Sequence, residues 1–197
     1  MKLYNFELSG NCYKVRLLCA LLGVPVEITD MDLPGGEHQR SSHIERNAFT
    51  QIPVLEDNGV TLRDSQAILI YIARKWRGDT WLPADAVSLA TVAQWLMVAE
   101  NEIARGPGDA RLHDKFGRAV DIDVAREKAH RLLAIMDAHL ARNEWLALGH
   151  STIADIACMP YIAISHEGGV TLERYPAVQA WINRIKKLPN FIPMPGM

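Results

Sequence analysis

The dipeptide Asp64-Ser65 is the part of the sequence whose residue types and position most clearly predict chemistry. Apolar residues follow it at helical spacing, so the pair is expected to lie at the N-terminus of a helix. The first N–H groups of a helix lack partners within it, and the helix dipole is positive at that end. A helix start of this kind can bind a carboxylate. The same two residues also fit a cap with a purely structural role.

A hairpin is predicted directly before this helix. Pro53 has no N–H to donate, so it should open a strand and not lie inside one. Residues 54–55 begin an apolar strand, and Asn58-Gly59 supplies the positive φ angles of a tight turn. Residues 60–62 form the returning strand. The unit predicted is a hairpin started by proline, followed by a helix whose N-terminus could hold a carboxylate.

The residues before this unit predict a βαβ arrangement. Short apolar strands are expected at 3–6 and 26–29, with a turn at 9–11 and a helix from Cys12 that ends at Gly23. Two strands joined by a helix at this length normally form a right-handed parallel crossover. A polar, weakly helical stretch at 37–47 then leads to the hairpin. The order is therefore βαβ followed by ββα.

The second half of the chain predicts helices without strands. Segment 81–83 is expected to be a linker, and the Gly- and Pro-containing segment 105–117 a loop. Thr152 and Asp155 have the spacing of a capping box. Helices are expected at 89–99, 124–140, 153–164 and from 176 onward. We therefore expect an α/β domain at 1–77 and an all-α domain at 84–197.

The composition excludes several other classes of protein. The chain has 197 residues, 49% hydrophobic and 22% charged, and a formal net charge of -2, which argues against a nucleic-acid surface. Its three cysteines lack metal-site spacing, and their odd number favours reduced thiols, so no metal is expected. The pattern of the first residues predicts a strand and not a signal peptide, and no apolar run is long enough to span a membrane. We expect a cytoplasmic protein.

The order of these motifs resembles that of the glutathione S-transferase family. Gln51-Ile52-Pro53, the hairpin and Asp64-Ser65 match the glutathione-binding half, and the box at 152–155 is similar to one in the family's helical domain. The resemblance implies a thioredoxin-like domain followed by a helical domain, glutathione as co-substrate and a homodimer with Ser65 near its two-fold axis. It also implies that Pro53 is cis, that 51–53 bind the cysteinyl part of glutathione, and that Asp64 and Ser65 bind its γ-glutamyl end.

The resemblance offers two donors for the glutathione sulfur. Ser9 lies where serine-type members carry a hydroxyl that donates to the sulfur, and Asn11 matches an amide that approaches it in the disulfide-reductase-like members. A free thiol with a pKa near 8.5 is mostly protonated at neutral pH, whereas the thiolate is the nucleophile. Ser9 could also only cap the following helix. Cys12 is expected to be structural, because the nucleophilic Cys of omega-type members aligns with Ser9.

The glycine end of glutathione is expected near His38 and Gln39. Many relatives have Lys where this chain has Gln39, and the loss of that charge should weaken binding unless His38 or Arg40 compensates. The other histidines are interpreted as solvated surface groups without a role: His43, His113, His130, His139, His150 and His166.

Three functions follow from these observations. The first is conjugation of glutathione, through Ser9, to a small apolar electrophile held between the domains. The second is reduction of disulfides or peroxides with glutathione, through Asn11, and the third is ligand binding without catalysis. Candidates for the wall that faces Ser9 across the domains are Trp95, Arg105, Arg111, Phe116 and Tyr161.

Overall fold

The α/β domain is built on a mixed four-stranded sheet. The computed structural model describes residues 1–77 and 79–197. The strands are β1 (Lys2–Asn5), β2 (Glu27–Asp30), β3 (Val54–Asp57) and β4 (Val60–Arg63), in the order β2-β1-β3-β4. β1 pairs with β2 in parallel and with β3 antiparallel, and the β3–β4 hairpin turns at Asn58 and Gly59, both at positive φ. The predicted βαβ-ββα arrangement is confirmed.

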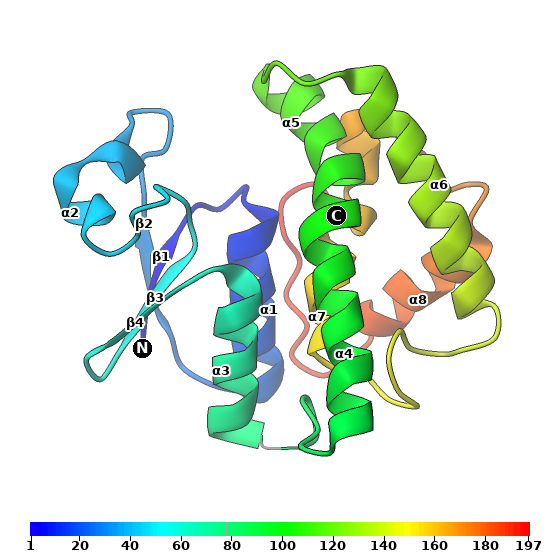
Figure 1. The fold of residues 1–197 in the computed structure, drawn as a ribbon, viewed down its shortest axis with the longest axis horizontal. Coiled ribbons are helices and arrows are strands. Elements are labelled where there is room, and N and C mark those ends of the chain that lie inside the picture. The colour runs from blue at the N-terminus through cyan, green and yellow to red at the C-terminus, as the bar shows by residue number, and fades with distance from the viewer. Residues whose placement is uncertain (78) are drawn as a thin grey trace.

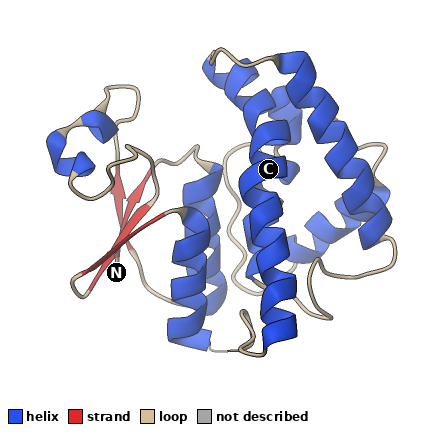
Figure 2. Ribbon diagram, viewed as in Figure 1, coloured by secondary structure: helices blue, strands red, loops and turns tan. Residues whose placement is uncertain are grey.

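Two helices separate the sheet from the helical domain. α1 (Gly10–Leu22) and α3 (Ser65–Arg77) pack on each other and cover one face of the sheet (Figures 1 and 2). α1 begins two residues earlier than expected, because Ser9 caps it by accepting a hydrogen bond from the Cys12 N–H at 3.2 Å. It ends at Gly23, whose φ of 65° fits the expected C-terminal glycine.

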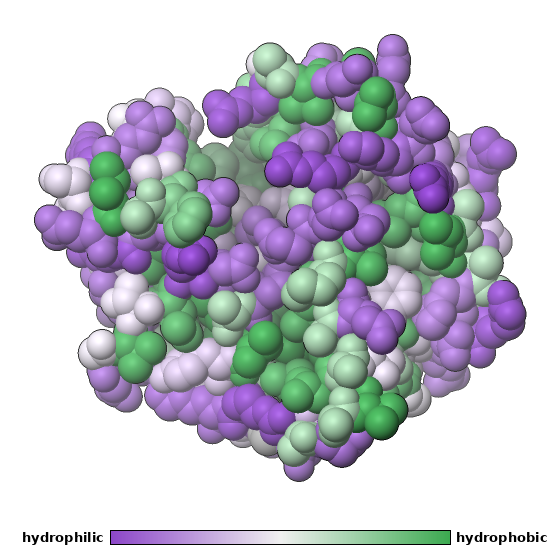
Figure 3. All heavy atoms as spheres, viewed as in Figure 1, coloured by the Kyte–Doolittle hydropathy of each residue, from purple (hydrophilic) through white to green (hydrophobic). Residues whose placement is uncertain are grey.

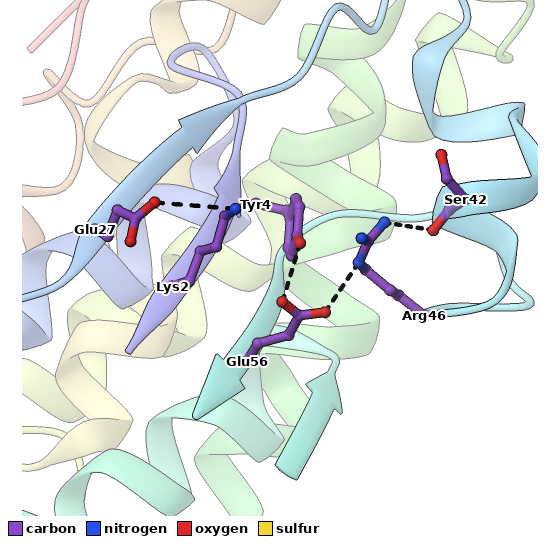
Figure 4. Close-up of polar contacts among 6 residues, drawn as sticks. All are labelled: Lys2, Tyr4, Glu27, Ser42, Arg46 and Glu56. Atoms are coloured by element: carbon purple, nitrogen blue, oxygen red, sulfur yellow. Dashed lines mark hydrogen bonds and ion pairs between the residues drawn. The ribbon is translucent and has the colours of Figure 1, made fainter. Parts of the chain in front are cut away.

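A short helical segment lies beside the sheet, away from the helical domain (Figure 1). It contains η1 (Glu37–Gln39) and α2 (Ser41–Ile44). Arg46 Nε donates to Glu56 of β3 at 2.9 Å, and the same carboxylate accepts from the Tyr4 hydroxyl at 3.0 Å. Arg46 also donates to the Ser42 carbonyl, as Figure 4 shows. These bonds fix the segment that carries His38 to the sheet.

The helical domain begins with three helical stretches that follow one another without a break. They are α4 (Ala86–Val98), η2 (Ala99–Gly108), which has wider π-type turns, and α5 (Asp109–Phe116). The remaining elements are α6 (Ile122–Leu140), α7 (Ile153–Ala163), η3 (Ser165–Gly168) and α8 (Pro176–Lys186). None of the described residues after Arg63 forms a strand.

The predicted loop at 105–117 is wrong, because most of this segment is helical. Wide turns accommodate Pro107, which lacks the N–H that a regular α-helix would use. Gly106 is required by packing: a Cβ there would lie 2.9 Å from the backbone nitrogen of Ala129 in α6. Gly106, which was expected to interrupt a helix, therefore permits a close contact between two helices.

Asp155 joins three parts of the helical domain. It completes the predicted capping box, since its Oδ2 accepts from the Thr152 N–H at 2.9 Å. Its Oδ1 accepts from the Leu146 N–H at 3.0 Å and from Trp181 Nε1 of α8 at 2.9 Å. Burial raises the pKa of Asp155, and these hydrogen bonds oppose that effect. The box thus ties α7 to α8 as well as starting α7.

No helix within residues 1–77 and 79–197 combines the length and the apolar character that a membrane span requires.

Candidate functional site

A pocket of about 270 Å³ lies between the two domains. The α/β domain provides most of its lining, and Glu100 of η2 closes it from the helical domain. Figure 3 shows the surface hollowed between the two domains on this face. The lining residues are Asn11, Leu33, His38, Thr50, Gln51, Ile52, Pro53, Asp64, Ser65 and Glu100.

The predicted hairpin and helix start form one side of this pocket. The Ile52-Pro53 peptide bond is cis, as the resemblance implied, and Pro53 directly precedes β3. Asp64 caps α3, because its Oδ1 accepts from the N–H groups of Gln66 at 2.9 Å and Ala67 at 3.0 Å. Ser65 is the first residue of α3 and is buried. The positive end of α3 therefore faces the pocket, with Asp64 beside it.

His43 holds the loop that precedes the cis proline. Its exposed fraction is 1%, and its Nε2 lies 3.0 Å from the Gln51 carbonyl oxygen. Asn47 Nδ2 donates to the same oxygen at 2.8 Å. The expectation that His43 is a solvated surface group is wrong, because a carbonyl in the next loop requires buried donors. No local sequence pattern pairs residue 43 with residue 51, so the signal was absent from the sequence.

The start of α1 contributes Asn11 to the pocket, while Ser9 is half-buried and outside its lining. The Ser9 hydroxyl oxygen accepts the capping bond and retains its own hydrogen for donation. Cys12 is fully buried, and burial raises the pKa of its thiol to about 11. A thiol with that pKa is neutral at physiological pH and is a weak nucleophile.

Lys14 is a buried cation behind Asn11 that sequence reasoning missed. Its exposed fraction is 1%, and its Nζ donates to Asn11 Oδ1 at 2.8 Å and to Gln66 Oε1 at 3.4 Å. Gln66 Nε2 in turn donates to Glu100 Oε2. Lys14 precedes Leu17 and Leu18 by three and four residues, which places it on the same buried helix face. That spacing was the available signal.

Charges of both signs lie around Lys14. Burial lowers the pKa of Lys14 to about 8, although Glu100 opposes the effect. Partial burial and the neighbouring Asp64 raise the pKa of Glu100. Two carboxylates near the positive end of α3 suit a ligand that carries an ammonium group and a carboxylate together.

The remaining candidates fall partly outside this pocket. His38 lines it, whereas Gln39 is exposed and is not part of its lining. Of the candidates for the wall, Tyr161 lies next to the start of α1, because a Cβ at Gly10 would be 2.7 Å from its ring. The contacts given for the other candidates lie within the helical domain: Trp95 packs on His139, Arg105 pairs with Asp109, and Arg111 pairs with Glu167 and Phe116.

The three cysteines, Cys12, Cys19 and Cys158, are free and buried. Residues 1–77 and 79–197 contain no group of three or more histidine, cysteine or acidic side chains arranged to hold a metal ion.

Comparisons with known proteins agree with this fold. The model of the glutathione S-transferase N-terminal domain matches residues 1–74, and that of the C-terminal domain matches 109–189. Glutathione S-transferase 3 of Zea mays is 33% identical over 99% of this chain and 96% of its own. A crystal structure of a glutathione S-transferase from Pseudomonas fluorescens is 33% identical, covers 98% of both chains and has a TM-score of 0.92. The chain belongs to the glutathione S-transferase family.

A further structure supports the fold. A glutathione transferase from Phanerochaete chrysosporium, in complex with oxidised glutathione, is 24% identical to this chain. It covers 96% of this chain and 91% of its own, with a TM-score of 0.86. This likeness concerns the architecture of the two domains.

Proposed function

We propose that this protein is a glutathione transferase that binds glutathione in the pocket between its domains and activates the thiol to attack a small apolar electrophile. One observation carries the proposal. The pocket joins the cis Pro53 edge, the start of α3 and Glu100, and Asn11 lies in the same lining. Family membership supports the same assignment.

The lining residues match the charged ends of glutathione. Asp64 and Glu100 would bind the ammonium group of the γ-glutamyl end, and the start of α3 at Ser65 would bind its carboxylate. Gln51, Ile52 and Pro53 would contact the cysteinyl part through the edge of β3. His38 would lie near the glycine carboxylate, with Gln39 at the outer rim.

Asn11 and Ser9 are the donors proposed for the sulfur. Asn11 is the principal one because its side chain lines the pocket, and the half-buried Ser9 is the second. A charge-assisted hydrogen bond contributes roughly 1.5–3 kcal/mol, which corresponds to about one to two units of pKa. Because the hydrogen bond stabilises the thiolate, it would lower the thiol pKa towards neutral pH.

Binding and reaction class can be tested together. Calorimetric titration with glutathione is expected to show binding, and cysteinylglycine, which lacks the γ-glutamyl end, is expected to bind much more weakly. Conjugation of an aryl halide should then exceed reduction of hydroxyethyl disulfide. Equal affinity for the two peptides would contradict the assignment of Asp64 and Ser65, and dominant disulfide reduction would contradict the proposed reaction.

Three wider proposals accompany this function. The protein is a cytoplasmic homodimer in which Ser65 lies near the two-fold axis, and its domains span 1–77 and 84–197. Sedimentation analysis tests the dimer, and limited proteolysis within 78–83 tests the boundary between the domains. A monomer at the concentrations of the activity assay would contradict the proposed homodimer.

A further inference from the structure

The orientation of the Asn11 amide is determined by its contact with Lys14. Lys14 Nζ lies 2.8 Å from Asn11 Oδ1. An ammonium group has three N–H donors and no acceptor, so it must meet the oxygen of an amide and not its nitrogen. The contact therefore uses the acceptor of Asn11 and leaves both of its N–H donors free to face other groups.

Gln66 shows the same effect on a second amide. Its Oε1 accepts from Lys14 at 3.4 Å and from the Ser65 hydroxyl at 2.7 Å. Its Nε2 is thereby turned outward and donates to Glu100. One buried cation thus contacts the oxygens of two amides, and for Gln66 the Glu100 carboxylate, which can only accept, favours the same orientation. Asn11 and Glu100 both line the pocket.

We propose that Lys14 is a positioning residue that holds the Asn11 amide with its N–H donors towards the glutathione sulfur. This inference rests on the proposed function, in which Asn11 is the principal donor to that sulfur. Lys14 lies on the buried face of α1 and acts through Asn11. Its loss should therefore affect the state of the bound thiol more than the binding of the peptide.

The protonation state of Lys14 determines whether it can orient the amide. The charged and titratable groups around it are Glu100 from η2, Asp64 before α3, and Cys158 and Tyr161 from α7, with its Nζ 5.7 Å from the Tyr161 ring centre. Burial lowers the pKa of Lys14 to about 8. Above that pH the amine gains a lone pair that can accept from Asn11 Nδ2, so either amide orientation becomes possible.

The orientation can be measured in the protein without ligand. The side-chain amide resonances of Asn11, assigned by their loss in Asn11→Ala, should shift with a midpoint near pH 8. This titration should disappear in Lys14→Met and persist in Lys2→Met, which removes a half-exposed lysine elsewhere in the domain. Asn11 resonances that keep their pH response in Lys14→Met would overturn the proposal, as would a wild-type protein that shows none.

The bound thiol gives a second, independent measurement. Ultraviolet titration should show the thiol pKa raised by about one unit in Lys14→Met, with glutathione affinity changed less than about threefold. Adding Lys14→Met to Asn11→Ala should cause no further rise, because both changes remove one interaction. An equal rise in the Asn11→Ala background would mean that the Lys14 charge acts directly on the sulfur, which overturns a positioning role.

Failure of the proposed function would look different. If calorimetry detects no glutathione binding to the wild type, the proposed function fails. The amide titration still decides, in that case, whether Lys14 orients Asn11.

Discussion

Gln66 donates a hydrogen bond through its Nε2 to Glu100, and this bond connects the start of α3 to the helical domain. Both residues lie at the pocket: Gln66 follows Ser65, and Glu100 is part of the lining. The site is therefore shared between the domains. Changes in the helical domain that move η2 should alter ligand binding without any change in the α/β domain.

Glu100→Gln should weaken glutathione binding by roughly fivefold, or about 1 kcal/mol. The substitution removes a charge proposed to meet the γ-glutamyl ammonium group, and the side chain is exposed enough for solvent to screen the interaction. Calorimetry at low and high salt measures the effect, which should shrink as salt rises. Glu102→Gln, at an exposed neighbouring position, is the matched control. An equal loss in both variants would show that Glu100 has no specific role.

Asn11→Ala should raise the pKa of bound glutathione by about one to two units, and Ser9→Ala should raise it less. Ser9→Ala should also lower the free energy of unfolding by about 1 kcal/mol, because it removes the cap of α1. Ultraviolet titration of the bound thiol and denaturant unfolding separate the two effects. A larger pKa change in the Ser9 variant would make the hydroxyl the principal donor.

Gln39→Lys should improve glutathione affinity by no more than about fivefold, and mainly at low salt. Residue 39 is exposed at the rim, so a new ammonium group there would interact with the glycine carboxylate through solvent. γ-Glutamylcysteine, which lacks glycine, should gain nothing. If both ligands gain equally in calorimetry, residue 39 does not face the glycine end.

Lys14→Met should change how stability depends on pH. The ordinary pKa of lysine is 10.5, and burial lowers that of Lys14 to about 8. Between these values the unfolded chain holds a proton that the folded protein has lost, so unfolding takes up a proton and stability rises with pH. The free energy of unfolding of the wild type should rise relative to Lys14→Met by up to about 3 kcal/mol over this range. Parallel curves in urea titrations would contradict a depressed pKa.

Asp155→Ala should lower the free energy of unfolding by about 3 kcal/mol or more, because it leaves several buried donors without partners. These donors are the Thr152 and Leu146 N–H groups and Trp181 Nε1. Glu127→Ala, at an exposed position in α6, should change stability by less than about 0.5 kcal/mol. A small loss in Asp155→Ala would mean that water replaces the carboxylate.

The sequence predicts those parts of the fold that depend on local rules. The Asn58-Gly59 turn, the end of α1 at Gly23 and the box at Thr152 each follow from the backbone preferences of a few consecutive residues. The pairing of Asp64 with the start of α3 follows in the same way.

Contacts between distant segments could not be predicted in this way. Gly106 was expected to interrupt a helix. Glycine is required there because a side chain would collide with the backbone of Ala129 in α6, a contact that the local sequence does not reveal. His43 was missed because such side chains are usually solvated, and only tertiary structure supplies its buried carbonyl partner. Lys14 was missed for the same reason, although its spacing from Leu17 and Leu18 was a local signal and its partner Asn11 lies one turn away in α1. The donors and acceptors of the candidate site were therefore identified in part, while the residues that orient them were not.

The wide turns of η2 determine how α5, which follows directly, is rotated about the helix axis. A regular α-helix advances about 100° per residue. Deleting one residue between 101 and 106 would leave Glu100 in place and turn α5 by about that angle, moving the buried Arg111 away from Glu167. The length of this stretch thus determines how two faces are rotated about the helix axis relative to each other. One face points at the ligand pocket and the other at the interior of the helical domain.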